Sequence, residues 1–207
     1  MTVSKKPETL MFAAALAGLA AFSAAPVRAA PADPAAAQID AFDAALLDTM
    51  KAGKTLGVQG RYRKLAPAVS QAFDAATMVR IAVGPSWSTI PAAQQQALTQ
   101  AFQRLTVAGY AHNFDGYSGE RFVLSPNVLT RGPDKVVQTQ IVASSGAVTI
   151  SYRMRQVGGT WKVIDVLYNG AISQLTTRRA DFTTTLAQGG AAGLLAHLNA
   201  LADKQLK

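Results

Sequence analysis

Hydrophobic side chains recur every three or four positions through the first half of the chain, and this spacing predicts α-helices. Asp74 can cap the third of them, and Pro91 suits the first turn of the fourth, where its missing N–H is not needed. Pro67 is an alternative start for the second helix. The helices are expected over residues 40–51, 62–73, 75–83 and 91–114, with breaks at Gly53, Gly57, Gly60 and Gly84-Pro85.

From residue 120 to residue 168 the pattern changes to strict alternation, which predicts β-strands. Val148, Ile150, Tyr152 and Met154 lie on one face of the clearest strand, and polar side chains lie on the other. Gly158-Gly159 predicts a hairpin turn. The strands are expected over residues 120–125, 135–142, 147–156 and 160–168, and helices return over 172–178, 180–186 and 191–206.

Helices, then an antiparallel meander, then helices again are typical of an α+β fold in which a curved sheet wraps several helices. No internal repeat interrupts this order. We expect a single domain over residues 39–207, preceded by a flexible Pro- and Ala-rich lead-in over residues 30–38.

The first residues have the pattern of an export signal. Lys5 and Lys6 precede an apolar run over residues 10–25, and Val27-Arg28-Ala29 offers small side chains where a signal peptidase reads them. The run of about 16 residues is shorter than the roughly 20 that span a bilayer. We therefore expect residues 1–29 to be a cleaved signal peptide and the protein to reside in the periplasm, with a retained membrane anchor as the alternative.

Composition narrows the classes of partner. The 207 residues carry a formal net charge of +8, and loss of Lys5, Lys6, Arg28 and Glu8 with the signal would lower it to +6. The basic residues lack the aromatic interleaving of a groove for single-stranded nucleic acid, so we expect no nucleic-acid partner. The excess charge favours an anionic headgroup, a membrane surface or an acidic protein as partner, with simple solubility as the alternative. Arg178-Arg179 is the basic pair expected to contact an acidic partner surface.

Few residues of the chain are arranged as a catalytic site requires. The chain has no cysteine, and His112 and His197 stand alone, so we expect no metal and no cofactor. Gly116-Tyr117-Ser118-Gly119 is one residue short of a nucleophile elbow. Asp165 lies in an apolar strand, where burial can raise a carboxylate's pKa and make it a base. Pairing of Asp165 with Arg153, with Arg155 or with a backbone N–H is the alternative, and we expect no enzyme.

What remains is apolar surface, which either fills a core or lines a cavity. Composition alone does not distinguish these two cases. The candidate lining residues are Phe73, Met78, Ile81, Leu98, Phe102, Leu105, Tyr110, Phe114, Val137, Ile150, Tyr152, Met154, Val163 and Tyr168.

Several stretches, in order and spacing, resemble one known family. They are residues 62–65, 73–78, 83–84, 87–88, 91–95, 161–166, 169–173, 176–179, 189–190 and 194–195, with Phe102, Tyr110, Phe182 and Leu186 between them. Over residues 40–203 the chain resembles the MlaC, or toluene-tolerance, family of periplasmic lipid-binding proteins. Residues 114–122 are more similar to its branch associated with hopanoid biosynthesis (HpnM-like) than to the phospholipid branch.

The resemblance implies a roll like that of nuclear transport factor 2, with a deep apolar pocket for acyl chains and no catalytic residues. It implies a carrier that shuttles phospholipid between outer and inner membranes and so maintains outer-membrane lipid asymmetry. The implied partners are an inner-membrane ABC transporter complex and an outer-membrane lipoprotein complex, and we expect a monomer. The alternatives are a hopanoid-trafficking protein, an enzyme on the same roll that uses Asp165 or His112, and an adaptor with a filled core.

Overall fold

The structure is a computed structural model that describes residues 33–207; the predicted signal peptide over residues 1–29 lies outside the described residues. Four helices precede a sheet and one long helix follows it, which confirms the α+β prediction. The helices are α1 (Pro34–Lys51), α2 (Gly53–Ala72), α3 (Ala75–Val83), α4 (Ala92–Asn113) and α5 (Gln174–Gln205), with a short 3-10 helix η1 (Gly84–Thr89) between α3 and α4. None of these helices combines the length and the hydropathy that a bilayer crossing requires.

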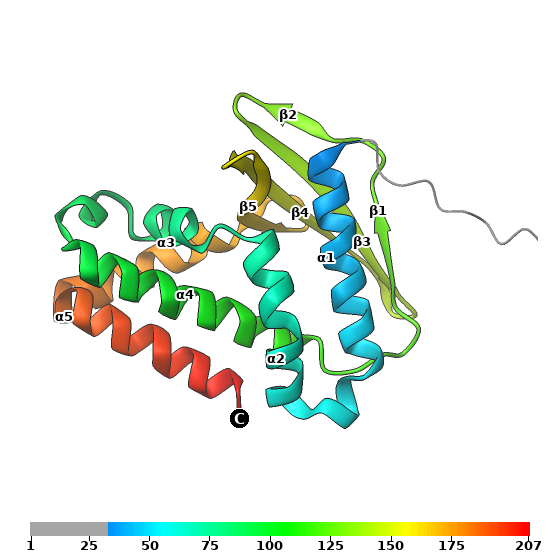
Figure 1. The fold of residues 1–207 in the computed structure, drawn as a ribbon, viewed down its shortest axis with the longest axis horizontal. Coiled ribbons are helices and arrows are strands. Elements are labelled where there is room, and N and C mark those ends of the chain that lie inside the picture. Colours follow the sequence, from blue (N-terminus) through cyan, green and yellow to red (C-terminus); the bar gives the residue numbers. More distant parts are fainter. Residues whose placement is uncertain (1–32) are drawn as a thin grey trace, which may run out of the picture.

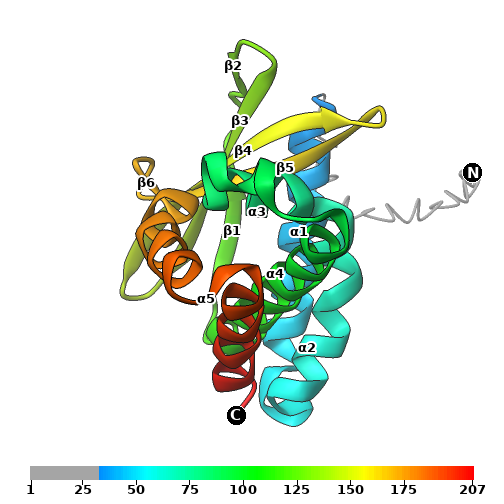
Figure 2. The same ribbon diagram turned by 90° about the vertical axis from the view of Figure 1, so that its left-hand side faces the viewer.

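The sheet is antiparallel throughout and curves around the helices (Figures 1 and 2). Its order is β1-β3-β4-β5-β6, and β2 pairs with the first residues of β3. In Figure 1, α1 crosses the sheet, whereas α4 and α5 run side by side away from it. The strands are β1 (Arg121–Leu124), β2 (Leu129–Arg131), β3 (Asp134–Ala143), β4 (Gly146–Val157), β5 (Thr160–Tyr168) and β6 (Ile172–Ser173).

The predicted alternation in β4 holds. Ile150, Tyr152 and Met154 are buried on the inner face, and across the sheet Tyr152 lies opposite Val137 and Val166. β-branched and aromatic side chains in such cross-strand pairs stabilise a half-buried sheet. The inner face of the sheet is therefore apolar where it meets the helices.

Helix α1 begins earlier than predicted, at Pro34, within the segment expected to be a flexible lead-in. Asp33 caps it by accepting a hydrogen bond from the Ala35 N–H at 2.8 Å. The same carboxylate pairs with Lys135 of β3 at 2.6 Å. Proline at the first helical position, alanine after it and an aspartate cap all favour a helix, so the lead-in prediction was wrong from residue 34.

The glycines before residue 62 do not end the helical region as predicted. Helix α2 starts at Gly53, and only Gly57, with φ of 60°, interrupts its helical backbone. A Cβ on Gly53 would lie 2.3 Å from the carbonyl oxygen of Asp115, so this glycine permits close packing of two backbones.

The tail differs from the prediction in the same way. Residues 172 and 173 form β6, and Ser173 caps α5 by accepting from the Thr176 N–H at 3.0 Å. The expected break at residue 179 is absent, and α5 bends only at Gly190, with φ of 59°. Strand β2 was not predicted. Its three residues are all exposed, so no alternation of apolar and polar side chains indicates a strand there.

A cluster of aromatic rings joins the helices to the sheet. Phe42 of α1 meets Phe73 and Tyr110 edge-to-face at 5.1 Å between centroids, and Tyr152 of β4 at 6.3 Å. Tyr110 of α4 then stacks on Phe114 at 5.7 Å. Such pairs contribute about 0.5–1.5 kcal/mol each beyond their buried area, so this cluster sets the position of α4 over the sheet.

A second fixed point is ionic and lies at the start of β3. Asp134 is only 1% exposed and accepts hydrogen bonds from Arg153 Nε and Arg155 Nε, both at 2.6 Å. Burial alone would raise the pKa of Asp134, but the hydrogen bonds from Arg155 and Arg153 outweigh it and lower that pKa below 3.8. The stability from this group is thus present above pH 3.8 and is lost as the pH falls through the lowered value.

We predict that Asp134→Asn lowers the free energy of unfolding by about 1–2 kcal/mol at pH 7, because it removes the carboxylate that both arginines bind. The loss is modest because both arginines are half-exposed and water screens their charges. The deficit should shrink below about pH 4, where the carboxyl of the unfolded chain becomes protonated, and should vanish as the pH falls through the lowered pKa of the folded protein. Urea titrations at pH 7 and pH 3 measure this. Asp48→Asn, which removes an exposed pair with Lys64, is the matched control and should change much less. An equal deficit at both pH values would contradict the ionic explanation.

Candidate functional site

Two adjoining cavities lie between the inner face of the sheet and the helices. The first, here the sheet cavity, has a volume of about 280 Å³ and is lined mainly by β3, β4 and β5. The second, here the helix cavity, has a volume of about 130 Å³ and lies between α3, α4, α5 and the end of β5. The two share Tyr110, Phe114, Val166 and Tyr168.

The sheet cavity has an apolar lining. Ile150, Tyr152 and Val166 form its buried wall, and it reaches the surface at the β3–β4 turn, where Val148 is 44% exposed. Ligand pockets for small molecules usually measure about 300–1,000 Å³. The sheet cavity is slightly smaller than this range, so a ligand of that size would need space beyond the sheet cavity.

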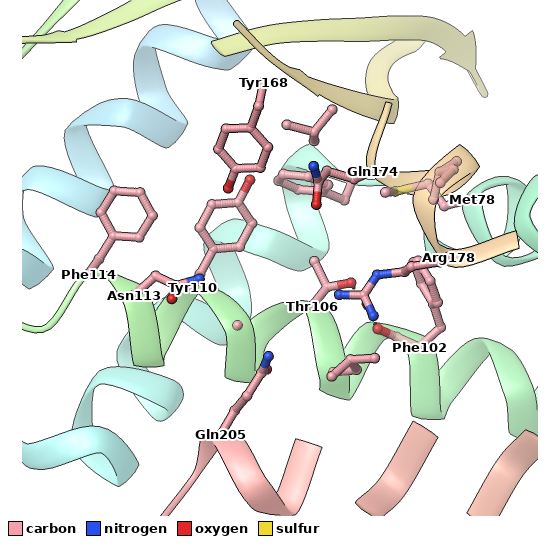
Figure 3. Close-up of a pocket in the computed structure, with 15 residues that line it drawn as sticks. Met78, Phe102, Thr106, Tyr110, Asn113, Phe114, Tyr168, Gln174, Arg178 and Gln205 are labelled. Atoms are coloured by element: carbon pink, nitrogen blue, oxygen red, sulfur yellow. Dashed lines mark hydrogen bonds between the residues drawn. The ribbon is translucent and has the colours of Figure 1, made fainter. Parts of the chain in front are cut away.

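The helix cavity combines an apolar wall with several polar side chains. Its wall includes Phe102 and Leu105 of α4 and Leu175 of α5, all buried. Figure 3 shows polar groups that face the same space from α4 and α5. They belong to Thr106, Asn113, Gln174, Arg178 and Gln205.

Three tyrosines meet where the cavities join. In Figure 3 the hydroxyls of Tyr110 and Tyr168 point toward each other. Tyr110 is also hydrogen-bonded to Tyr152, and burial raises the pKa of both phenols well above 10, with Tyr168 and Asp43 acting in the same direction. These hydroxyls are therefore neutral at physiological pH. Tyr168 is 39% exposed, so it forms part of the rim of the two cavities.

The structure brings nine of the fourteen predicted lining residues to the cavities. Of the other five, Leu98, Val137, Met154 and Val163 are buried in the core, and Ile81 is partly buried on α3. These five line neither cavity, because an inward-facing position can be filled by a neighbour. The nine are Phe73, Met78, Phe102, Leu105, Tyr110, Phe114, Ile150, Tyr152 and Tyr168.

The sequence reasoning missed the contribution of α5. Leu175, Arg178 and Gln205 line the helix cavity, yet none of them was among the predicted lining residues. Leu175 carried an apolar signal and Arg178 was expected to contact an acidic partner, whereas Gln205 carried neither signal. The paired arginines also differ: Arg178 faces the cavity, whereas Arg179 donates to the Ile81 carbonyl at 2.9 Å.

Asp165 has a structural arrangement of partners. It accepts hydrogen bonds from the Val166 N–H at 2.8 Å, the Ser173 hydroxyl at 2.6 Å and the Leu175 N–H at 3.4 Å. The expected arginine partners bind Asp134 instead, so the backbone alternative was right and the pairing with Arg153 or Arg155 was wrong. Asp165 thus fixes the start of α5 against β5.

The histidines do not assemble a reactive site. His112 is exposed, and His197 Nε2 lies 2.8 Å from Asp181 at the surface of α5. Within residues 33–207, no three acidic or histidine side chains are placed to hold a metal ion.

Comparison with known proteins identifies a family and a related fold. The family model described as "MlaC protein" matches residues 40–200. A solved structure of the phospholipid-binding protein from Ralstonia solanacearum, in complex with a phospholipid, superimposes with a TM-score of 0.73 at 22% sequence identity. The match covers 84% of this chain and 100% of that one. Curated protein sequences give no significant match to the chain.

The hydrogen bonds of Asp165 give a test of its role. Asp165→Ala leaves two backbone N–H groups and a hydroxyl without their acceptor, so we predict a loss of about 3 kcal/mol in the free energy of unfolding. Chemical denaturation measures this. Asp181→Ala, which removes a surface pair with His197, should cost far less. A fully stable Asp165→Ala variant would show that the carboxylate does not hold α5.

Proposed function

The chain belongs to the MlaC family, and on this premise we propose that it binds a phospholipid and carries it through an aqueous compartment. The observation that carries the proposal is the apolar sheet cavity, which opens to the surface at the β3–β4 turn and shares four lining residues with the helix cavity. The related fold from Ralstonia solanacearum was solved with a phospholipid bound. A protein with a filled core would not offer this space.

A phospholipid needs such a carrier because its acyl chains are apolar. Moving two acyl chains of about sixteen carbons into water costs on the order of 20 kcal/mol, at roughly 0.8 kcal/mol per CH₂. A pocket lined by Ile150, Val166, Phe102 and Leu105 replaces the bilayer for those chains. The carrier then needs no reaction chemistry, which agrees with the structural partners of Asp165.

We propose further that the carrier works in the periplasm as a monomer. Its partners would be an outer-membrane lipoprotein complex and an inner-membrane ABC transporter complex, between which it shuttles phospholipid. The export pattern of residues 1–29 and the family resemblance support this placement.

The first test is native mass spectrometry of the gently purified protein, followed by organic extraction and identification of the lipid. We expect a stoichiometric phospholipid. A stoichiometric hopanoid would instead favour the hopanoid branch. A clean apo mass that liposomes leave unchanged would contradict the carrier proposal.

A second test fills the cavities from within. We predict that Phe102→Trp in the helix cavity or Ile150→Trp in the sheet cavity lowers phospholipid uptake severalfold, because the larger ring occupies ligand space. Overpacking costs about 1–3 kcal/mol, so each variant must first be shown to fold by circular dichroism. Val123→Trp, at an exposed position of β1, is the matched control. Normal uptake by both folded cavity variants would mean that the lipid binds elsewhere.

A further inference from the structure

Arg178 is a partly buried cation that has no hydrogen-bonded or ion-paired partner among residues 33–207. Figure 3 shows it extending from α5 toward Thr106 of α4, inside the helix cavity. The adjacent Arg179 is exposed and bonded to a carbonyl, so the difference belongs to position 178 and not to the basic pair.

The surroundings of Arg178 penalise its charge. Phe102, Leu105 and Leu175 form the apolar wall beside it, and desolvation lowers the pKa of the guanidinium although Asp181 and Tyr168 oppose the shift. Asp181 itself is bonded to His197 at 2.8 Å. A guanidinium remains charged in proteins, so its cost persists until an anion enters.

A second polar group in the same cavity also lacks a partner. The Oε1 atom of Gln205 is buried, and no described residue donates a hydrogen bond to it. Gln205 reaches the cavity from the last turn of α5, whereas Arg178 reaches it from the second turn. A buried acceptor without a donor and a partly buried cation without an anion lie on separate halves of one helix, and together they point to a polar ligand rather than to an isolated packing fault.

On the basis of the lipid-carrier function above, we propose that Arg178 binds the phosphodiester of the lipid in the helix cavity, while acyl chain fills the sheet cavity. The planar guanidinium can donate two parallel hydrogen bonds to phosphate oxygens. The side-chain amides of Gln174 and Gln205 lie on the same cavity and can bind neighbouring headgroup or glycerol oxygens. The shared rings of Tyr110, Phe114 and Tyr168 then surround the junction of headgroup and chain.

The test compares two lipids that differ only in the phosphate headgroup. Lipid-free full-length protein is loaded from vesicles that contain equal amounts of dioleoyl phosphatidylglycerol and dioleoylglycerol, and native mass spectrometry gives the ratio bound. We expect wild type to prefer the phospholipid. In Arg178→Gln the bound ratio of phospholipid to dioleoylglycerol should fall about tenfold, and in Arg178→Lys it should fall less. Arg179→Gln is the matched control and should keep the wild-type ratio.

The outcomes separate this inference from the carrier function. An unchanged ratio in Arg178→Gln, with both lipids bound, would overturn the role of Arg178 and leave the carrier function standing. Wild type that binds neither lipid would contradict both. If inorganic phosphate raises the Tm of lipid-free wild type but not of Arg178→Gln, while the lipid ratio is unchanged, the site binds a free anion and the lipid assignment is wrong.

The stability of the lipid-free protein gives an independent readout. An unpaired cation that serves a ligand does not stabilise the empty fold, so Arg178→Gln should match or exceed the wild-type Tm. A fall of several degrees together with an unchanged lipid ratio would make Arg178 a structural residue.

Discussion

The edge-to-face contacts of Phe42 are the constraint on which the rest of this structure depends. One ring touches Phe73 after α2, Tyr110 of α4 and Tyr152 of β4, so four elements meet at a single side chain of α1. Aromatic rings are rigid and wide, and here they fix α4 at one distance from the sheet. Tyr110 and Phe73 of this cluster line the helix cavity, and Tyr110 and Tyr152 line the sheet cavity. The cavities are therefore a product of how the core is packed.

The sequence predicted the elements better than their ends. Alternation from Val148 to Met154 identified the inward face of β4 because a strand places every second side chain on one side. The same reasoning failed at Gly53, because its close approach to the backbone of Asp115 is a tertiary contact that no local pattern records. The branch-specific likeness of residues 114–122 stays a prediction, since the family match does not distinguish branches.

The alternation along the strands predicted which side chains point inward, but not which of them line open space. Ile150 and Met154 lie on one face of one strand, yet the first lines open space and the second is enclosed by neighbours. Arg178 and Arg179 are identical in type and adjacent in sequence, and only the rotation of α5 turns one inward and leaves the other exposed. Which inward positions stay empty depends on side chains that arrive from distant segments. A single sequence does not specify those meetings.

Gly190 divides the helix that supplies both polar ends of the helix cavity. With φ of 59° and ψ of −160°, this residue adopts a backbone conformation that strains any side chain, so glycine is required for the bend. Arg178 lies in the segment of α5 before the bend, and Gln205 lies in the segment after it. The angle at one peptide thus sets how far apart two recognition groups stand. A different angle at Gly190 would therefore change the distance between Arg178 and Gln205, and with it the width of the helix cavity, while every lining residue stayed the same.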